Sequence, residues 1–276
     1  MKTSFLKHKL YSISFWLKGL FLISLISLSS CSNYQKILKG NDYDLKMKTA
    51  IELYEKKEYG KAYPILEELI SIFRATNKAE DIYYYYAFTN YHLDDLVSAA
   101  YHFQQFSKTY PNSKRAEETA FMAAYCFYKG SPVYSLDQTN TYKAINELQL
   151  YLNSYPNSTR VAECNELIDK LRAKLEKKDY ETGLLFFNLM DYKAANVSLR
   201  NTLKNFPNTK YKEEIMLLIL KSNYNLAENS VEEKKKERYK QTIDAYINFI
   251  DKFADQKKLK EAEAIYTSAR SKYERL

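Results

Sequence analysis

The sequence predicts an all-α fold made of repeated helix pairs. One segment recurs three times with small changes, as Tyr110-Pro111-Asn112-Ser113, Tyr155-Pro156-Asn157-Ser158 and Phe206-Pro207-Asn208-Thr209. Alanine precedes each proline by twelve positions, at Ala99, Ala144 and Ala195. A large apolar residue precedes each proline by eight positions, at Phe103, Leu148 and Leu199. The chain also has only five Gly and five Pro among 276 residues, as helices require. Stacked helix pairs of this kind bury a continuous core and form an α-α superhelix, or solenoid.

Each recurrent segment predicts a helix boundary. Its aromatic residue closes one helix, its proline prevents the helix from continuing, and Asn-Ser or Asn-Thr can cap the next one. The stretch 160–187 has no proline and predicts one long helix. The expected pairs are 42–57 with 60–74, 80–93 with 96–109, 114–129 with 140–154, 160–187 with 191–205, and 212–228 with 233–254, followed by a helix over 257–274.

Further small residues are expected where paired helices cross closely. Ala87 and Gly183 stand twelve positions before Ala99 and Ala195. Ala124 is the corresponding residue before Ala144, displaced by an insertion near residues 131–141. Ala50 and Ala62 have the same spacing in an earlier repeat. As a set, these positions resemble the tetratricopeptide repeat of 34 residues. The resemblance implies a solenoid of about five repeats over residues 42–276.

Residues 1–30 predict a signal peptide. Four lysines and no acidic residue occur in this stretch, and residues 19–28 are an apolar run too short to span a bilayer as a helix. The run ends at Leu28-Ser29-Ser30-Cys31, which resembles the lipobox of bacterial lipoproteins and implies lipidation of Cys31, with residues 31–41 as a lipidated N-terminus and linker. The alternatives are a cleaved signal with an incidental cysteine and a retained membrane anchor.

Composition does not indicate a nucleic-acid partner. The net charge is +8, but the four leader lysines account for half of it, leaving 38 basic against 34 acidic residues. Lys234-Lys235-Lys236 lies among glutamates, which is typical of a solvated helix face. No basic block with interleaved aromatic residues follows an RNA-binding spacing.

The sequence contains no recognisable catalytic, metal-binding or phosphate-binding motif. We therefore expect no enzyme, no cofactor and no metal. Asp94-Asp95 is interpreted as a helix cap at a corner rather than a metal site. Cys126 and Cys164 are expected to be small buried apolar residues, and a disulfide between them stays open.

The candidate site is a peptide-binding groove lined by the first helix of each pair. The expected lining residues are Tyr54, Tyr84, Phe88, Tyr91, Phe121, Tyr125 and Tyr128, with Ile51, Glu55, His92 and Lys129 beside them. Tyrosine provides a large, rigid contact area at low entropic cost. The alternative is that many of these rings pack between repeats, because the run Tyr83–Tyr86 cannot face one way throughout.

A lipobox, a short linker and about five repeats with Tyr-Pro-Asn-Ser closures resemble the BamD family, the lipoprotein subunit of the β-barrel assembly machine. The resemblance covers essentially the whole chain after Cys31. It implies a non-enzymatic protein on the periplasmic face of the outer membrane. The amino-terminal repeats would receive the terminal strand of unfolded outer-membrane proteins, and the carboxy-terminal repeats would dock a BamA-type β-barrel protein.

Similar repeats occur in the division-coordinating partner of the Tol–Pal system. The lipobox and the lack of a heptad segment before the repeats disfavour that family. A repeat lipoprotein that scaffolds another envelope complex is the remaining alternative.

Overall fold

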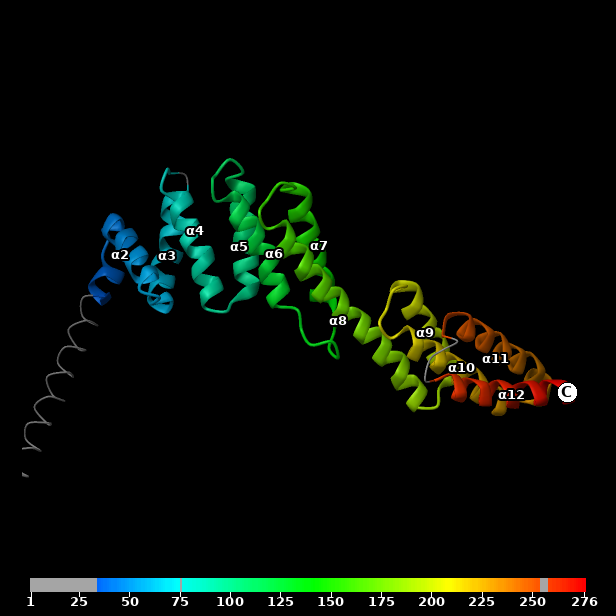
Figure 1. Cartoon of the computed structure of the whole chain (residues 1–276). Coiled ribbons are helices and arrows are strands. Elements are labelled where there is room, and N and C mark those ends of the chain that lie inside the picture. Colours follow the sequence, from blue (N-terminus) through cyan, green and yellow to red (C-terminus); the bar gives the residue numbers. More distant parts are fainter. Residues whose placement is uncertain (1–33, 75, 254–257) are drawn as a thin grey trace, which may run out of the picture. The chain divides into compact units, whose positions relative to one another are not determined.

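The computed structural model describes residues 34–74, 76–253 and 258–276, and every regular element in them is a helix. The predicted leader and Cys31 lie outside the described residues. The helices, labelled in Figure 1, are α2 Tyr43–Glu55, α3 Tyr59–Phe73, α4 Ala79–His92, α5 Leu96–Thr109, α6 Ala116–Lys129, α7 Thr139–Ser154, α8 Val161–Asn188, α9 Tyr192–Asn205, α10 Lys212–Glu228, α11 Glu232–Phe253 and α12 Leu259–Arg275.

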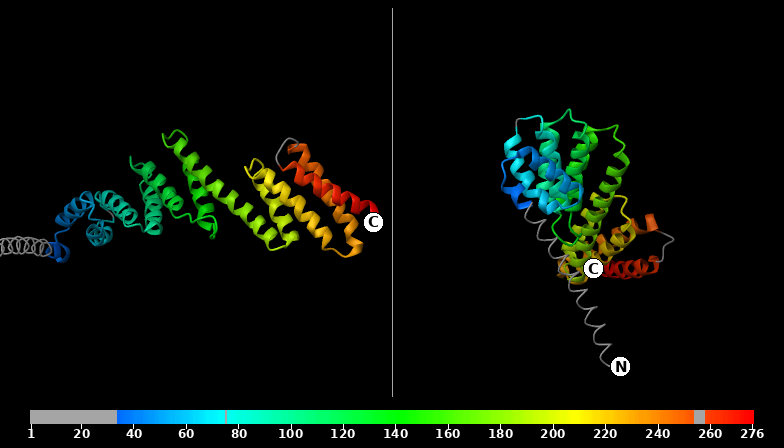
Figure 2. Two further views of the ribbon diagram at one scale, coloured as in Figure 1. Left: turned by 60° about the horizontal axis from the view of Figure 1, so that its bottom comes forward. Right: turned by 90° about the vertical axis from the view of Figure 1, so that its left-hand side faces the viewer.

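The packing divides the chain into two units, with the boundary between Lys129 and Gly130. In the first unit, which contains α2 to α6, helices that are adjacent in the chain pack on each other, and α2 also contacts α4. In the second unit α7 to α12 follow the same rule, and α10 also contacts α8 and α12 (Figures 1 and 2). This packing of each helix on its neighbour confirms the predicted all-α repeat fold. The boundary falls between α6 and α7, which the sequence predicts to be one pair.

The small residues expected at helix crossings are all buried. The alanines at positions 50, 62, 87, 99, 124, 144 and 195 are at most 1% exposed. Gly183 on α8 is buried as well, and a Cβ atom built on it would collide with the side chain of Leu199 on α9. The expected large partners Phe103, Leu148 and Leu199 are fully buried. The spacing therefore marks the contact points between paired helices.

Three of the turns between paired helices share one backbone conformation. Lys57, Asp94 and Met190 each have a φ near +60° and lie between the two helices of a pair. The acidic residue that follows begins the next helix, and the carboxylates of Asp95 and Asp191 each accept an amide hydrogen bond of 3.0 Å from within it. A left-handed residue followed by a cap turns the chain back sharply. This confirms that Asp95 is a helix cap.

The recurrent closures also connect successive pairs. Ser113 accepts the amide hydrogen of Arg115 at 3.0 Å, and its hydroxyl donates to Glu80 one repeat earlier at 2.6 Å. Thr209 makes the same two contacts, with the amide of Tyr211 and with Glu176. The hydroxyl therefore closes the turn just before the new helix and ties that turn to the first helix of the preceding pair.

The insertion that precedes α7 is held against α8. Lys174 donates to the carbonyl and hydroxyl of Ser131, at 3.2 and 2.6 Å. Lys178 donates to the carbonyls of Tyr134 and Leu136, at 3.3 and 2.7 Å. The ammonium of Lys177 lies 4.2 Å from the ring centroid of Tyr134. The lysines of the long helix thus satisfy carbonyl groups that an isolated loop would leave to water.

Candidate functional site

The first unit carries a group of half-buried aromatic side chains on the first helices α2, α4 and α6. Tyr54 lies near the end of α2, Tyr84 and Tyr91 lie on α4, and Tyr125 and Tyr128 lie on α6. Helical spacing of three or four residues places such side chains in rows along one face. We call these five tyrosines the aromatic surface. All five were expected from the sequence.

Ring contacts link members of this group to one another and to neighbours. The centroids of Tyr54 and Tyr85 are 5.0 Å apart, and those of Tyr84 and Tyr85 are 5.7 Å apart. His92 contacts both Tyr54, at 5.8 Å, and Tyr91, at 5.4 Å. On α6 the rings of Tyr125 and Tyr128 stack at 5.7 Å. The rings therefore support each other and present a pre-arranged surface.

Phe88 and Phe121 are corrections to the expected lining. Phe88 is 9% exposed and packs edge-on against Phe103 of α5, with ring centroids 4.8 Å apart. Phe121 is 3% exposed. Both lack a polar tip, so burial between helices costs them nothing in hydrogen bonding. They pack against the buried side of the aromatic surface and are not part of it.

Sequence reasoning missed Tyr59 and Tyr85. Tyr59 is the first residue of α3, and its ring stacks on His92 with centroids 4.3 Å apart. Tyr85 packs on Tyr54, as described above. Tyr59 lies on the second helix of its pair, whereas the groove was expected on the first helices. Tyr85 could have been predicted from the sequence, because it lies within the run Tyr83–Tyr86 and three positions before Phe88, a helical spacing that places the two residues on one face.

The run Tyr83–Tyr86 diverges, as expected. Tyr83 hydrogen-bonds to Nδ1 of His102 on α5 at 3.3 Å, and the hydroxyls of Tyr86 and Tyr63 are 3.3 Å apart. Tyr84 instead donates to Glu118 of α6 at 3.0 Å. Successive helical residues point about 100° apart, so only part of the run can reach the aromatic surface.

The aromatic surface has cations at its border, and three of its tyrosines are partly desolvated. Burial raises the pKa of Tyr54, Tyr84 and Tyr91, so their hydroxyls stay protonated. The ammonium of Lys129 lies 4.8 Å from the ring centroid of Tyr91, and the guanidinium of Arg115 lies 4.3 Å from that of Tyr84. Arg115 is already paired with Asp81 at 2.5 Å, so the groups that suit a peptide with a terminal aromatic residue and a free carboxylate are the ring faces, the hydroxyls and the ammonium of Lys129.

His92 lies at the centre of these contacts and is held neutral. Burial lowers its pKa, and the nearby charges of Lys129 and Lys57 lower it further. A neutral imidazole packs against tyrosine rings without the desolvation cost of a charged one. Acidification is therefore expected to disturb the packing around Tyr54 and Tyr59.

No other chemistry stands out in the part of the chain that the structure describes. It contains no group of three or more His, Cys, Asp or Glu side chains able to hold a metal ion. Cys126 and Cys164 are free and buried, and burial raises their pKa values to about 12 and about 11, which keeps the thiols protonated and unreactive. None of the described helices is long and apolar enough to cross a membrane.

Three basic residues of the carboxy-terminal repeats differ in whether their side chains are available to a partner protein. Arg238 is half-buried and donates to the hydroxyl of Ser230 and to the carbonyl of Leu226, so it secures the corner between α10 and α11. Lys210 and Lys234 are exposed. Only the last two can therefore meet a partner without breaking a contact at that corner.

Comparison with known proteins points to one family. A family model, YfiO, described as an outer membrane lipoprotein, matches residues 44–240, which is more than half of the chain. None of the curated proteins matches the chain. Among solved structures it is similar to a thermophilic TPR protein of Thermus thermophilus, with 13% sequence identity over 82% of this chain and 98% of that one. The TM-score of that match is 0.33.

Proposed function

Because the chain belongs to the YfiO family of outer membrane lipoproteins, we propose that it is a BamD-like assembly factor. In this role it works with a BamA-type β-barrel protein to fold and insert other β-barrel proteins into the outer membrane. The family match is the observation that carries the proposal. The repeat fold supports it, because stacked helix pairs present extended surfaces for binding other proteins.

The aromatic surface is the proposed receptor for unfolded outer-membrane proteins, whose terminal strand often ends in an aromatic residue. Tyr91 and Tyr125 offer ring faces and hydroxyls for that residue. Lys129 lies beside Tyr91 and can meet the terminal carboxylate. Its present ion pair with Asp94 is long, at 3.6 Å, and Asp94 is largely exposed, so little stability is lost when Lys129 turns to a ligand.

Lipidation of Cys31 is the proposed anchor. Two or three acyl chains hold a protein on a bilayer stably, whereas one chain does so only marginally. The repeats would then lie on the periplasmic face of the outer membrane. The carboxy-terminal repeats are proposed to dock the periplasmic domains of the BamA-type protein.

The first test is a pull-down of the native lipoprotein extracted in detergent, with the bound proteins identified by mass spectrometry. We expect a BamA-type β-barrel protein in near-equal amount. Recovery of Tol–Pal or cell-wall synthesis proteins in its place would contradict the assembly role. The chain would then be a scaffold for that other envelope complex.

The second test concerns the aromatic surface. Tyr91→Ala with Tyr125→Ala should weaken binding of a synthetic peptide that ends in Phe with a free carboxylate by about tenfold, or ~1.4 kcal/mol. Fluorescence polarisation measures the affinity. Tyr101→Ala is the matched control, because Tyr101 is an exposed tyrosine on the second helix α5 and should leave binding unchanged.

Circular dichroism must first show that the double variant is folded. Unchanged affinity in a folded double variant would remove the aromatic surface as the peptide site. Equal losses in the double variant and in Tyr101→Ala would remove it as well, because the effect would then not be local.

A further inference from the structure

The amino-terminal end of the described chain is fixed to the first unit. Residues 34–39 form a short helix that precedes α2. The hydroxyl of Tyr34 donates to the backbone carbonyl of Lys61 on α3 at 3.0 Å. Tyr34 and Leu38 also pack against the buried core that α2, α3 and α4 form. The chain is therefore already part of the first unit at Tyr34.

This attachment leaves a very short link to the proposed lipid. Only Ser32 and Asn33 lie between Cys31 and Tyr34. A chain of three residues spans at most about 11 Å, even when it is fully extended. The Debye length at physiological salt is about 8 Å, so charges at this distance are only partly screened. A lipid on Cys31 would thus hold the short helix close to the headgroups of the bilayer.

The outer side of the short helix is basic. Lys36 and Lys39 are exposed and stand three positions apart, which places them on one face of a helix. Gln35 and Asn41 are exposed beside them, and residues 34–41 contain no acidic side chain. We call these four residues the lysine face. Neither of its lysines forms an ion pair with a carboxylate of the residues that the structure describes.

The charged groups of α2 nearest to the lysine face already have partners. The carboxylate of Asp42 accepts an amide hydrogen bond of 2.9 Å from within α2, and Asp44 pairs with Lys78 at 2.5 Å. Lys46 is 2% exposed and pairs with Glu68 at 2.5 Å. The positive charge of the lysine face is therefore available to an anion outside the protein.

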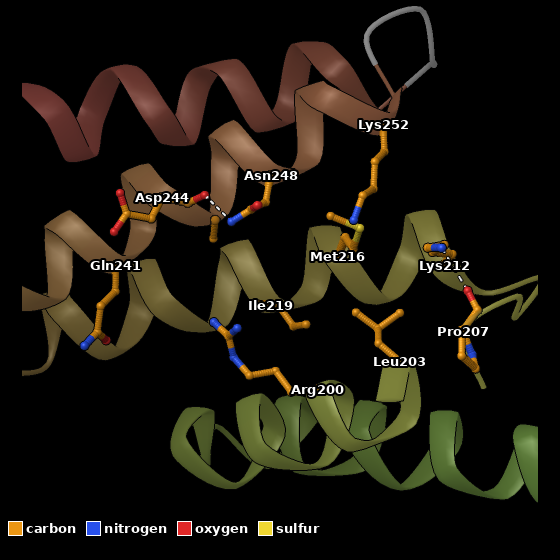
Figure 3. A pocket seen from close by; sticks show the side chains of 11 residues that line it. Arg200, Leu203, Pro207, Lys212, Met216, Ile219, Gln241, Asp244, Asn248 and Lys252 are labelled. Atoms are coloured by element: carbon orange, nitrogen blue, oxygen red, sulfur yellow. Dashed lines mark hydrogen bonds between the residues drawn. The ribbon is translucent and has the colours of Figure 1, made fainter. Parts of the chain in front are cut away.

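The cations of the second unit have no such link to the proposed lipid. Figure 3 shows Arg200 and Lys252 at the border of a hollow between α9, α10 and α11. Met216 and Ile219, which line this hollow, are 8% and 6% exposed and belong to the core of the unit. Arg200 and Lys252 are surface cations over buried core, and the whole first unit separates them from Cys31 in the sequence.

We propose that the lysine face contacts anionic headgroups of the bilayer in which the lipid of Cys31 is inserted. The inference rests on the proposed lipidation and adds to it a protein surface that binds the membrane. Each lysine beside an anionic bilayer favours contact by roughly fivefold, so two lysines hold a tethered unit on the surface most of the time. The first unit then stays beside the membrane and does not move on a free tether.

The test uses the lipoprotein purified in detergent and reconstituted into vesicles. Trp16 is the only tryptophan of the sequence and lies in the predicted leader, so Asn41→Trp gives the mature protein a single tryptophan on the lysine face. The vesicles contain phosphatidylethanolamine, a lipid with a nitroxide on its headgroup, and either phosphatidylglycerol or phosphatidylcholine. The nitroxide quenches tryptophan only at short range, and time-resolved fluorescence gives the ratio of quenched to unquenched molecules.

We expect this ratio to be about tenfold higher with anionic phosphatidylglycerol than with neutral phosphatidylcholine. Lys36→Gln with Lys39→Gln, combined with Asn41→Trp, should lower the ratio about tenfold in the anionic vesicles. The two lysines are exposed, so this variant should keep the wild-type thermal midpoint.

Lys108→Gln with Lys114→Gln is the matched control. Both are exposed lysines of the first unit, around the turn between α5 and α6, and their replacement removes the same total charge. The ratio should change by less than about twofold, because charge acts weakly beyond the Debye length.

Intact mass spectrometry separates this proposal from the lipid anchor itself. If the mass of the acyl chains is missing, lipidation of Cys31 is wrong. The lysine face is then tested on the chain prepared without residues 1–30, with Cys31 coupled to a maleimide lipid in the same vesicles. Cys126 and Cys164 are buried and do not compete for the maleimide.

The proposal is contradicted if, with a lipid on Cys31 by either route, the two kinds of vesicle quench the tryptophan equally. It is also contradicted if the two lysine double variants lower the ratio alike, because total charge and not the lysine face would then be responsible.

Discussion

Tyr84 combines packing with an outward-facing polar group. Its ring lies 4.6 Å from that of Phe88 and carries the guanidinium of Arg115 on its face, while its hydroxyl donates to Glu118 of the next first helix. Replacing Tyr84 would remove support for the fold together with any binding contact. Tyr91 and Tyr125 are better probes of binding for that reason.

Met190 provides a prediction at the same scale. It occupies the left-handed corner between α8 and α9 with a φ of 61°, and its side chain is 73% exposed. A side chain in this conformation costs about 1 kcal/mol that glycine avoids. Met190→Gly should therefore raise the free energy of unfolding by about 0.5–1 kcal/mol, measured by urea denaturation.

Val197→Gly is the opposing control. Val197 is exposed in the middle of α9, where glycine is less favourable than valine by a few tenths of a kcal/mol, or about 1 kcal/mol relative to alanine. The two glycine variants should thus change stability in opposite directions. A loss of stability in Met190→Gly would show that the corner is not strained.

At the scale of the element, the crossing of α8 and α9 depends on one missing methyl group. Gly183 lets α9 approach so closely that the side chain of Leu199 fills the space where a Cβ atom would lie. Leu199 is fully buried, so a Cβ atom on residue 183 would have to displace a side chain within a close-packed interior. The helix pair is therefore specified by a small residue on one helix and a large one on the other.

Gly183→Ala should be destabilising despite the better helix propensity of alanine. Overpacking costs about 1–3 kcal/mol, and the propensity gain returns at most about 1 kcal/mol. We expect a net loss of about 1 kcal/mol or more in urea denaturation. Gly60→Ala is the matched control on α3, since a Cβ there meets no atom within 4 Å, and it should be neutral or stabilising.

At the scale of the whole molecule, the histidines connect stability to pH. His92 and His102 are the two histidines after the predicted leader, and burial lowers the pKa of both in the folded chain. The unfolded chain binds protons first as the pH falls below about 6.5, so folding stability decreases from that point. The stabilising effect is fully present above the unfolded pKa.

We therefore expect the thermal midpoint of the first unit to fall between about pH 7 and pH 5. His92→Gln with His102→Gln should flatten this dependence, measured by circular dichroism across that range. Carboxylates such as Asp95, whose pKa is lowered by the amide hydrogen bond of Ser98, act only at lower pH. An equally steep decline in the double variant would assign the effect to other groups.

The proposed lipid anchor gives a prediction for the whole chain. If Cys31 carries the lipid, Cys31→Ala should move the protein from the membrane fraction to the soluble periplasm, because no thiol would remain for lipidation. Fractionation with immunoblotting measures this. Continued sedimentation with membranes in high salt would show that another segment is the anchor.

The repeat fold follows from the sequence because its contacts are local and periodic. Within each of the two units every helix packs on its neighbour along the chain, so the spacing of alanine, large apolar residue and proline already describes the core. The corner cap at Asp95 and the length of α8 were predictable for the same reason, since both depend on residues close together in the sequence.

The candidate site depended more on tertiary structure. Phe88 and Tyr91 lie on the same helix and both matched the expected pattern, yet only the packing of α5 against α4 buries Phe88 and leaves Tyr91 half-exposed. Sequence by itself determined which residues form helices and meet their neighbours; tertiary structure decided which side chains remain for a partner, since exposure depends on all the surrounding helices at once.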